Sequence, residues 1–263
     1  MAFCTLQDGE KLYYETHGDG PPLALVSGLG GTLAFWKPHV AAFARRFRVV
    51  LHDHRGTGRS SRTRMDYSVD QMVDDLVQLL DHLRIERAHF VGHSTGGAIG
   101  QTMALDHPKR LNRLAISASW TTADAYFNRL FDFRAEVLRK SGPLAYTQGM
   151  TLFAVPPTYL RDHAAEFDAE ERANAAAMTP EIVLSRIQAI QRFDRRKDLK
   201  KIKTPTLVFG VEDDHITPAY YSRALARAIP RARLVMFKDG GHLYPRVHPR
   251  EFQKTILAFL RAK

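Results

Sequence analysis

The sequence is poor in the features that mark secreted, disulfide-rich or membrane-spanning chains. Cys4 is its only cysteine, so no disulfide framework can form within the chain. No apolar run approaches the ~20 residues that a membrane-spanning helix requires. The N-terminal residues include Asp8, Glu10 and Glu15 and lack the apolar segment of a secretory signal. These absences predict a cytoplasmic protein that does not enter a membrane.

Acidic residues are outnumbered by basic ones: 28 Asp and Glu stand against 38 Lys and Arg, which gives a formal net charge of +10. Such a charge can attract nucleic acids, anionic membranes or acidic small molecules. The densest basic cluster, residues 195–203, has no interleaved aromatic side chains and no zinc-finger, RNA-binding or basic-zipper pattern around it. We therefore expect a solvated surface there and no nucleic-acid partner. The charge favours an anionic small-molecule substrate, and the oligomeric state stays open, a homo-oligomer included.

The rest of the composition, 44% apolar and 25% charged residues, is that of an ordinary globular protein. Segments typical of strands alternate with segments of helical spacing. Strands are expected at residues 11–16, 23–26, 48–52, 88–91, 111–117, 206–209 and 233–237, and helices at residues 40–47, 68–83, 99–105, 220–228 and 249–260. This alternation predicts an α/β fold whose mostly parallel sheet is covered by helices on both faces.

The alternation of strands and helices breaks in the middle of the chain. Residues 120–203 are rich in alanine, arginine and aromatic residues, show helical spacing and contain few β-branched runs. Strand signals resume at Thr206. We therefore predict a core of residues 1–119 and 204–263, interrupted by a helical insertion over residues 120–203.

The most specific chemical signal is the segment Gly92-His93-Ser94-Thr95-Gly96, which follows an expected strand and precedes an expected helix. This is the G-x-S-x-G elbow, in which a serine occupies a strained turn and is exposed to substrate. Glycines two residues to either side are required because a Cβ atom there would clash with a neighbouring strand or helix. The N-terminus of the helix also presents N–H groups and a positive dipole to the reaction centre. Ser94 is therefore the predicted nucleophile.

A serine nucleophile needs a base and an acid that orients the base, and the elbow predicts the chain order Ser, Asp or Glu, His. Asp214 follows one expected strand, and His242 follows the next. Both positions are at the carboxyl ends of strands, where open α/β sheets gather their ligands. We predict His242 as the base and Asp214 as the acid. Asp213 is the alternative acid, and Asp124 is a more distant one.

The developing oxyanion needs backbone N–H donors, one of them from the residue after the nucleophile, which is Thr95. The second comes from the loop after an earlier strand. The glycine-rich loop at residues 27–32 suits this position, and the Leu29 N–H is the predicted donor. Loss of one such donor typically lowers the rate by ~10²–10³.

Two rival interpretations of these segments are weaker. The glycines of residues 28–31, followed by Asp53, resemble a dinucleotide-binding fingerprint, but Leu33 stands where the third glycine belongs. His52 and His54 alternate at a strand end, yet no third metal ligand accompanies them. We therefore expect neither a cofactor nor a metal.

The elbow, the acid and the histidine together resemble the α/β-hydrolase family, and the resemblance extends over residues 23–260. Residues 53–60, with the pattern D-x-R-G-x-G-x-S, look like the turn after the fourth strand of that family. Residues 205–208 look like the return of its chain from the cap. The resemblance implies an eight-stranded type of sheet and identifies residues 120–203 as a helical cap, or lid, over the pocket.

Two small-substrate groups of the family are the most similar. Residues 27–31 and 152–156 look like aminoacrylate hydrolases of pyrimidine breakdown, and residues 28–31 and 193–196 look like 3-oxoadipate enol-lactonases. Ser27 departs from the histidine that usually precedes this glycine in the wider family. The aminoacrylate group does not always keep a serine at the elbow, so Ser94 favours acyl-transfer chemistry.

The sequence thus predicts a serine hydrolase of a small ester or lactone that bears a carboxylate. A C–N hydrolase of the aminoacrylate, amide or carbamate type is the first alternative, and a C–C hydrolase or a ligand-binding protein without turnover is the second. Arginines of the insertion could hold the substrate carboxylate, because a guanidinium matches it with two parallel hydrogen bonds. The candidates are Arg129, Arg134 and Arg139.

Overall fold

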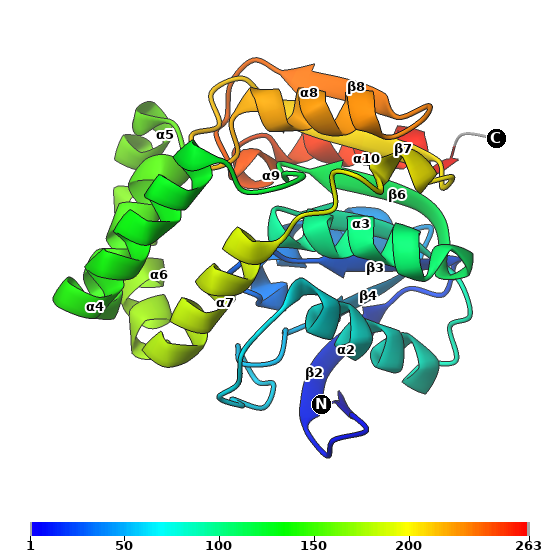
Figure 1. The fold of residues 1–263 in the computed structure, drawn as a ribbon, viewed down its shortest axis with the longest axis horizontal. Coiled ribbons are helices and arrows are strands. Elements are labelled where there is room, and N and C mark those ends of the chain that lie inside the picture. The colour runs from blue at the N-terminus through cyan, green and yellow to red at the C-terminus, as the bar shows by residue number, and fades with distance from the viewer. Residues whose placement is uncertain (1, 262–263) are drawn as a thin grey trace.

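The structure of the protein is a computed structural model that describes residues 2–261. It is built on one sheet of eight strands (Figure 1). The strand order is β1-β2-β4-β3-β5-β6-β7-β8; β1 and β2 run antiparallel to their neighbours, and the other pairs are parallel. The strands are β1 (Ala2–Thr5), β2 (Lys11–His17), β3 (Pro22–Val26), β4 (Arg48–His52), β5 (Ala88–His93), β6 (Leu111–Ser117), β7 (Thr206–Val211) and β8 (Arg233–Phe237). The predicted fold class is confirmed.

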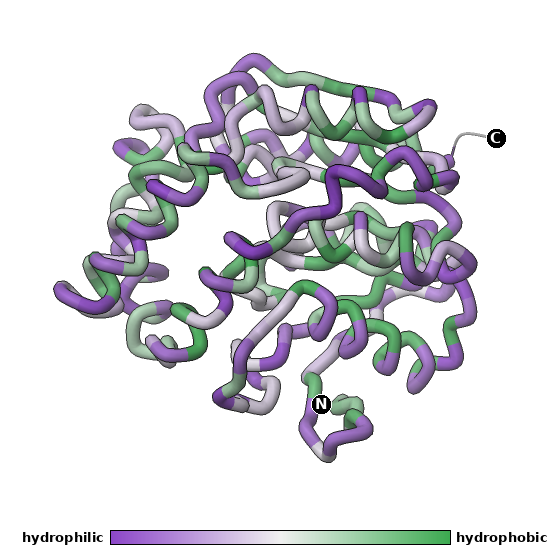
Figure 2. The backbone as a smooth tube through the Cα atoms, in the orientation of Figure 1, coloured by the Kyte–Doolittle hydropathy of each residue, from purple (hydrophilic) through white to green (hydrophobic). Residues whose placement is uncertain are grey.

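Helices cover both faces of this sheet, as expected for a mostly parallel sheet. Helices α2, α3 and α8 lie on one face, and α1 and α10 pack against the other, each over its own apolar cluster. The helices outside the central insertion are α1 (Lys37–Ala44), α2 (Val69–His82), α3 (Thr95–Asp106), α8 (Ala219–Ala228), α9 (Tyr244–Val247) and α10 (Pro249–Arg261), with short 3₁₀ turns η1 (Leu33–Trp36), η2 (Pro108–Arg110) and η3 (Leu199–Lys201). Along these helices hydrophobic and hydrophilic residues alternate, while the central strands are largely hydrophobic (Figure 2).

The helix predicted at residues 68–83 illustrates how the local sequence specifies an element. Ser68 is its N-cap and accepts a hydrogen bond from the Gln71 N–H at 3.0 Å. The apolar face, which includes Met72 and Leu76, is buried against the sheet. Capping and a single apolar face together fix where this helix begins and how it packs.

Four helices are inserted between β6 and β7: α4 (Ala125–Ala154), α5 (Pro157–Asp162), α6 (Ala164–Ala176) and α7 (Pro180–Arg192). They stand together beyond one end of the sheet (Figure 1), and α4 packs against both α6 and α7. Helix α4 is kinked at Gly142, which has a φ of 83° and precedes Pro143. Within the described residues, no helix has the length and apolar composition needed to cross a membrane.

Candidate active site

Ser94 occupies the sharp turn between β5 and α3, with φ 55° and ψ −116°. A positive φ is unusual for a residue with a Cβ atom and indicates a strained backbone. The glycine requirement also holds: a Cβ on Gly92 would lie 2.1 Å from the Gly96 carbonyl oxygen, and one on Gly96 would lie 2.1 Å from that of Val26. The turn is held further by the Ser94 N–H, which donates to Ser117 O at 2.8 Å. The strand, the turn and the helix therefore fit together only with this spacing of glycines.

The structure brings Asp214 and His242 together, with the carboxylate Oδ2 2.9 Å from the imidazole Nδ1. Both side chains are buried. The carboxylate also accepts the backbone N–H groups of Ile216 and Thr217 at 2.8 and 2.9 Å, and the Thr217 hydroxyl at 2.8 Å. A carboxylate that is fixed by these three donors can hold the imidazole in one orientation and one tautomer.

The acidic residues next to Asp214 in the sequence, and the alternative acid Asp124, have different partners. Asp213 accepts the N–H groups of Gly240 and Gly241 at 3.1 and 2.8 Å and so supports the loop that carries His242. Glu212 is exposed and pairs with Arg223. Asp124, the most distant candidate, is the N-cap of α4. Of these carboxylates, Asp214 is the one that contacts His242.

His93 links the elbow to His242, because its ring centroid lies 4.9 Å from that of His242. The His93 ring also stacks on Phe35, with the ring centroids 4.7 Å apart, and its Nδ1 is 3.2 Å from the Ser117 hydroxyl. Burial, and to a smaller extent the charge of His242, hold the pKa of His93 well below its usual value. A neutral His93 therefore packs beside His242 without opposing a positive charge on it.

The loop after β3 lies directly against the elbow. A Cβ added to Gly28 would be 3.1 Å from the Ser94 Cβ, and the Gly31 N–H donates to Gly28 O at 3.0 Å to close a turn around Leu29. Thr95 is the first residue of α3, and its N–H is one of those that a helix leaves without an intrahelical acceptor. The structure thus places Leu29 and Thr95 on the two backbone segments that border Ser94. Ser27, at the position where the wider family usually has histidine, donates its hydroxyl to Thr32 O at 2.7 Å and so braces this loop.

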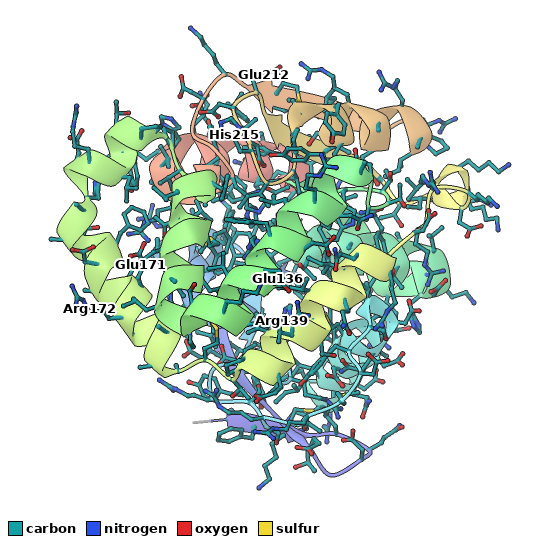
Figure 3. All side chains as sticks on the ribbon, turned by 60° about the vertical axis from the view of Figure 1, so that its left-hand side comes forward. Glu136, Arg139, Glu171, Arg172, Glu212 and His215 are labelled. Carbon is teal, nitrogen blue, oxygen red and sulfur yellow. The ribbon has the colours of Figure 1, made fainter. Side chains whose placement is uncertain are left out.

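The three candidate arginines of the insertion are placed differently from one another. Arg134 is buried, donates to the Tyr146 hydroxyl at 2.8 Å and lies over aromatic rings of α4. Arg139 is half exposed and pairs with Glu136 at 3.1 Å on the same helix (Figure 3). Arg129 is exposed. The contacts of Arg134 and Arg139 are thus made within α4, and their role toward a substrate stays a prediction.

Sequence reasoning missed Arg186, which lies on α7 and is completely buried. Its Nε donates to Leu29 O at 3.2 Å, so this helix reaches the loop beside Ser94. A signal for it exists: Arg186 falls four residues after Ile182 and four before Ile190, on the apolar face of the helix. A charged residue in that position indicates a buried polar contact.

Metal-binding geometry is not found at His52 and His54, whose rings stack at 4.9 Å. Burial and the Arg186 charge lower the pKa of both, that of His52 to about 4. In the part of the chain that the structure describes, no three His, Cys, Asp or Glu side chains are grouped as metal ligands would be. The chemistry that this region can support is thus that of a buried serine, imidazole and carboxylate with backbone donors.

Comparison with known proteins places this geometry in context. The family described as the alpha/beta hydrolase fold matches residues 21–248. Several relatives carry the name "Putative carbamate hydrolase RutD". That of Azorhizobium caulinodans is 40% identical over 250 residues and covers 94% of each chain. That of Caulobacter sp. (strain K31) is 42% identical over 257 residues, covering 95% of this chain and 96% of the other. Among solved structures, the enol-lactonase from Burkholderia xenovorans LB400 is similar with a TM-score of 0.92 at 28% identity, covering 99% of this chain and all of the other.

Proposed function

This chain belongs to the α/β-hydrolase fold family, and from that premise we propose that it is a serine hydrolase that cleaves the C–N bond of a small carbamate or related carbonyl compound. The observation that carries the reaction type is the buried Asp214–His242 pair at 2.9 Å, placed beside the Ser94 elbow. The C–N preference is supported by the names of relatives that are about 40% identical over nearly the whole chain. This choice promotes the first alternative of the sequence analysis above its ester and lactone interpretation.

In the proposed mechanism Ser94 Oγ attacks the carbonyl carbon while His242 accepts its proton. Asp214 keeps Nδ1 of the imidazole protonated, which leaves Nε2 free to act as the base. The tetrahedral oxyanion is stabilised by the Leu29 and Thr95 N–H groups and by the N-terminus of α3. The C–N bond then breaks, and the amine leaves with the proton from His242. Water, deprotonated by the same imidazole, releases the acyl group and restores Ser94.

We propose further that helices α4–α7 form the cap of this site, within an insertion at residues 120–203. Three contacts support this role, each from the insertion to a loop that carries proposed machinery. Ala154 O accepts the N–H of Leu243 at 2.9 Å, next to His242. The Tyr126 hydroxyl donates to His215 O, next to Asp214. Arg186 donates to Leu29 O.

A fluorophosphonate probe tests the proposed nucleophile. We expect a single covalent adduct on Ser94 in intact-mass measurements, absent from the Ser94→Ala and His242→Ala variants, each of which should keep the fold by circular dichroism. Turnover should fall by at least ~10³ in Ser94→Ala. An adduct on another residue, or normal turnover in Ser94→Ala, would contradict the proposal.

The bond preference needs a matched set of substrates. We would measure the rate enhancement over uncatalysed hydrolysis for a carbamate, an amide and a lactone of similar size, each with one carboxylate. Loss of substrate is followed by chromatography for all three, and amine release is followed with a fluorogenic reagent for the carbamate and the amide. The largest enhancement is expected for the carbamate. The enol-lactonase likeness favours one second candidate, hydrolysis of a small lactone, and a larger enhancement for the lactone would establish it instead. Matched neutral compounds show whether the substrate must be anionic.

A further inference from the structure

Arg186 combines complete burial with the absence of a direct carboxylate partner. Its guanidinium donates to three neutral acceptors: Leu29 O at 3.2 Å, Arg55 O at 3.1 Å and His54 Nδ1 at 3.0 Å. Among the described residues no carboxylate lies within ion-pair distance of it, although Asp75 acts on it from farther away. Burying a charge in this way is costly unless hydrogen bonds compensate for it. The three contacts must therefore supply that compensation.

The surroundings of Arg186 are arranged for a fixed positive charge. Burial lowers the pKa of the guanidinium to about 10, so the group is still charged at neutral pH. The pKa of His54 is held well below its usual value, first by burial and then by Arg186, so its imidazole is neutral. A neutral imidazole that accepts at Nδ1 carries its proton at Nε2. Because a guanidinium can only donate, this contact assigns to His54 the tautomer with its proton on Nε2.

The guanidinium also packs on the turn that carries the proposed oxyanion donor. Gly31 has a φ of 69°, and a Cβ added there would lie 2.9 Å from Arg186 Nη2 and 2.9 Å from Thr57 Oγ1. The turn from Gly28 to Gly31 is closed by its own hydrogen bond, and Gly28 touches the elbow. The turn is therefore held between Arg186 on one side and Ser94 on the other. The Leu29 carbonyl that accepts from Arg186 is joined to the Leu29 N–H through a single Cα atom. Holding the carbonyl in place therefore restricts the direction of the N–H.

We propose that Arg186 is a positioning residue that couples α7 to the oxyanion hole. Its three hydrogen bonds keep the Gly28–Gly31 turn in place. The Leu29 N–H therefore points at the reacting atom only while α7 is packed against the core. This inference rests on the proposed function, because it assumes that Leu29 serves as an oxyanion donor. The Arg contact spans 157 positions of the chain and joins the insertion to the core.

The test compares two arginines of the same helix. Arg192 also donates from α7 to a core carbonyl, Tyr67 O at 3.0 Å, but it is half exposed and contacts no part of the turn. We would make Arg186→Met, Arg186→Lys and the control Arg192→Met. The saturation kinetics of fluorophosphonate labelling separate kinact, which requires the oxyanion hole, from KI, which reports binding. Hydrogen–deuterium exchange of peptides that cover residues 28–33 measures the order of the turn without reference to catalysis.

We expect kinact to fall by ~10–100-fold in Arg186→Met with KI unchanged, since a displaced donor acts only on the transition state. The same variant should exchange faster at residues 28–33. Arg192→Met should leave both readouts within about twofold of wild type. Lysine keeps the charge but lacks the planar fork, so Arg186→Lys should also lose at least ~5-fold in kinact. If Arg186→Met does not fold, the lysine variant decides the question.

The inference would be overturned by an unchanged kinact in a folded Arg186 variant, or by unchanged exchange at residues 28–33. Equal losses in Arg192→Met would show general loosening of α7 and overturn it as well. Failure of the proposed function is distinct from these outcomes, since wild type would then not label at Ser94 at all. In that case exchange at residues 28–33 still decides whether Arg186 holds the turn.

Discussion

Asp213 and Asp214 are adjacent carboxylates that hold different parts of the same site. Asp214 accepts a hydrogen bond from His242, whereas Asp213 accepts two hydrogen bonds from backbone N–H groups of the loop that carries His242. An amide at position 214 would present an N–H group where an acceptor is needed and would favour the wrong imidazole tautomer. The two substitutions should therefore differ sharply in their effect on catalysis.

We expect Asp214→Asn to lower kinact for the fluorophosphonate probe by ~10³–10⁴, by analogy with triads in other hydrolases. Asp213→Asn keeps an oxygen that accepts one of the two loop N–H groups, so its loss should stay within ~10-fold. Intact-mass kinetics on both variants measure this difference, and thermal unfolding controls for stability. Equal losses in the two variants would remove the distinction drawn between them.

The same two residues show how far sequence reasoning reaches. The order of nucleophile, acid and histidine, with each at a strand end, points to the segment that contains Asp214, and the structure shows this residue in contact with His242. It left Asp213 open, because consecutive residues differ only in the direction of their side chains, which the tertiary structure of the loop decides. Arg186 was missed for a related reason: a helical pattern marks its buried face but not Leu29, a partner 157 positions away.

Among the structural elements, the sequence predicts a strand followed by a helix at the junction of β5 and α3, but it does not predict where the helix begins. The helix begins at Thr95, directly after Ser94, whereas the apolar pattern indicated a start at residue 99. Gly96 and Gly97 have low helix propensity and hide the first turn, and close packing requires them. Strand β1 was missed because its four residues are too few to show a pattern.

This junction makes a prediction about stability. In Gly96→Ala the new Cβ would meet the Val26 carbonyl oxygen at 2.1 Å, a contact with backbone that cannot move aside easily. We expect a loss of about 3 kcal/mol or more, at the upper end of overpacking effects. Gly149→Ala in α4 is the matched control, since an added Cβ there meets nothing within 4 Å. It should gain about 0.5–1 kcal/mol through helix propensity.

Urea unfolding followed by circular dichroism measures both free energies. Each variant adds one methyl group, so a difference between their free energies of unfolding reports the steric contact at position 96 and not the change of residue type. Wild-type stability in Gly96→Ala would mean that β3 and α3 can separate at the elbow, contrary to the close approach described.

For the molecule as a whole, the interior contains several histidines that folding keeps neutral. Burial lowers the pKa of His39 and His52 to about 4, and those of His54 and His93 lie well below the usual value. In the unfolded chain each would titrate near 6.5. Below that pH the unfolded state binds more protons than the folded state, so acid favours unfolding. The stabilisation is complete above about pH 6.5 and is lost as the pH falls toward 4.

His39 offers a test of this proton linkage at a position that is not among the proposed catalytic residues. It packs against Trp36 and Phe252 and has Gln253 as its hydrogen-bonding partner. Each histidine kept neutral adds up to ~1.4 kcal/mol per pH unit to the slope between pH 6.5 and 4. We expect His39→Gln to flatten the slope by up to that amount, while the control His215→Gln, at an exposed position, leaves it unchanged. Urea unfolding at pH 7.5, 6.5, 5.5 and 4.5 measures the slopes. An unaltered slope in His39→Gln would show that His39 accepts a proton in the folded protein, and that its interior is more accessible to solvent than the packing around His39 indicates.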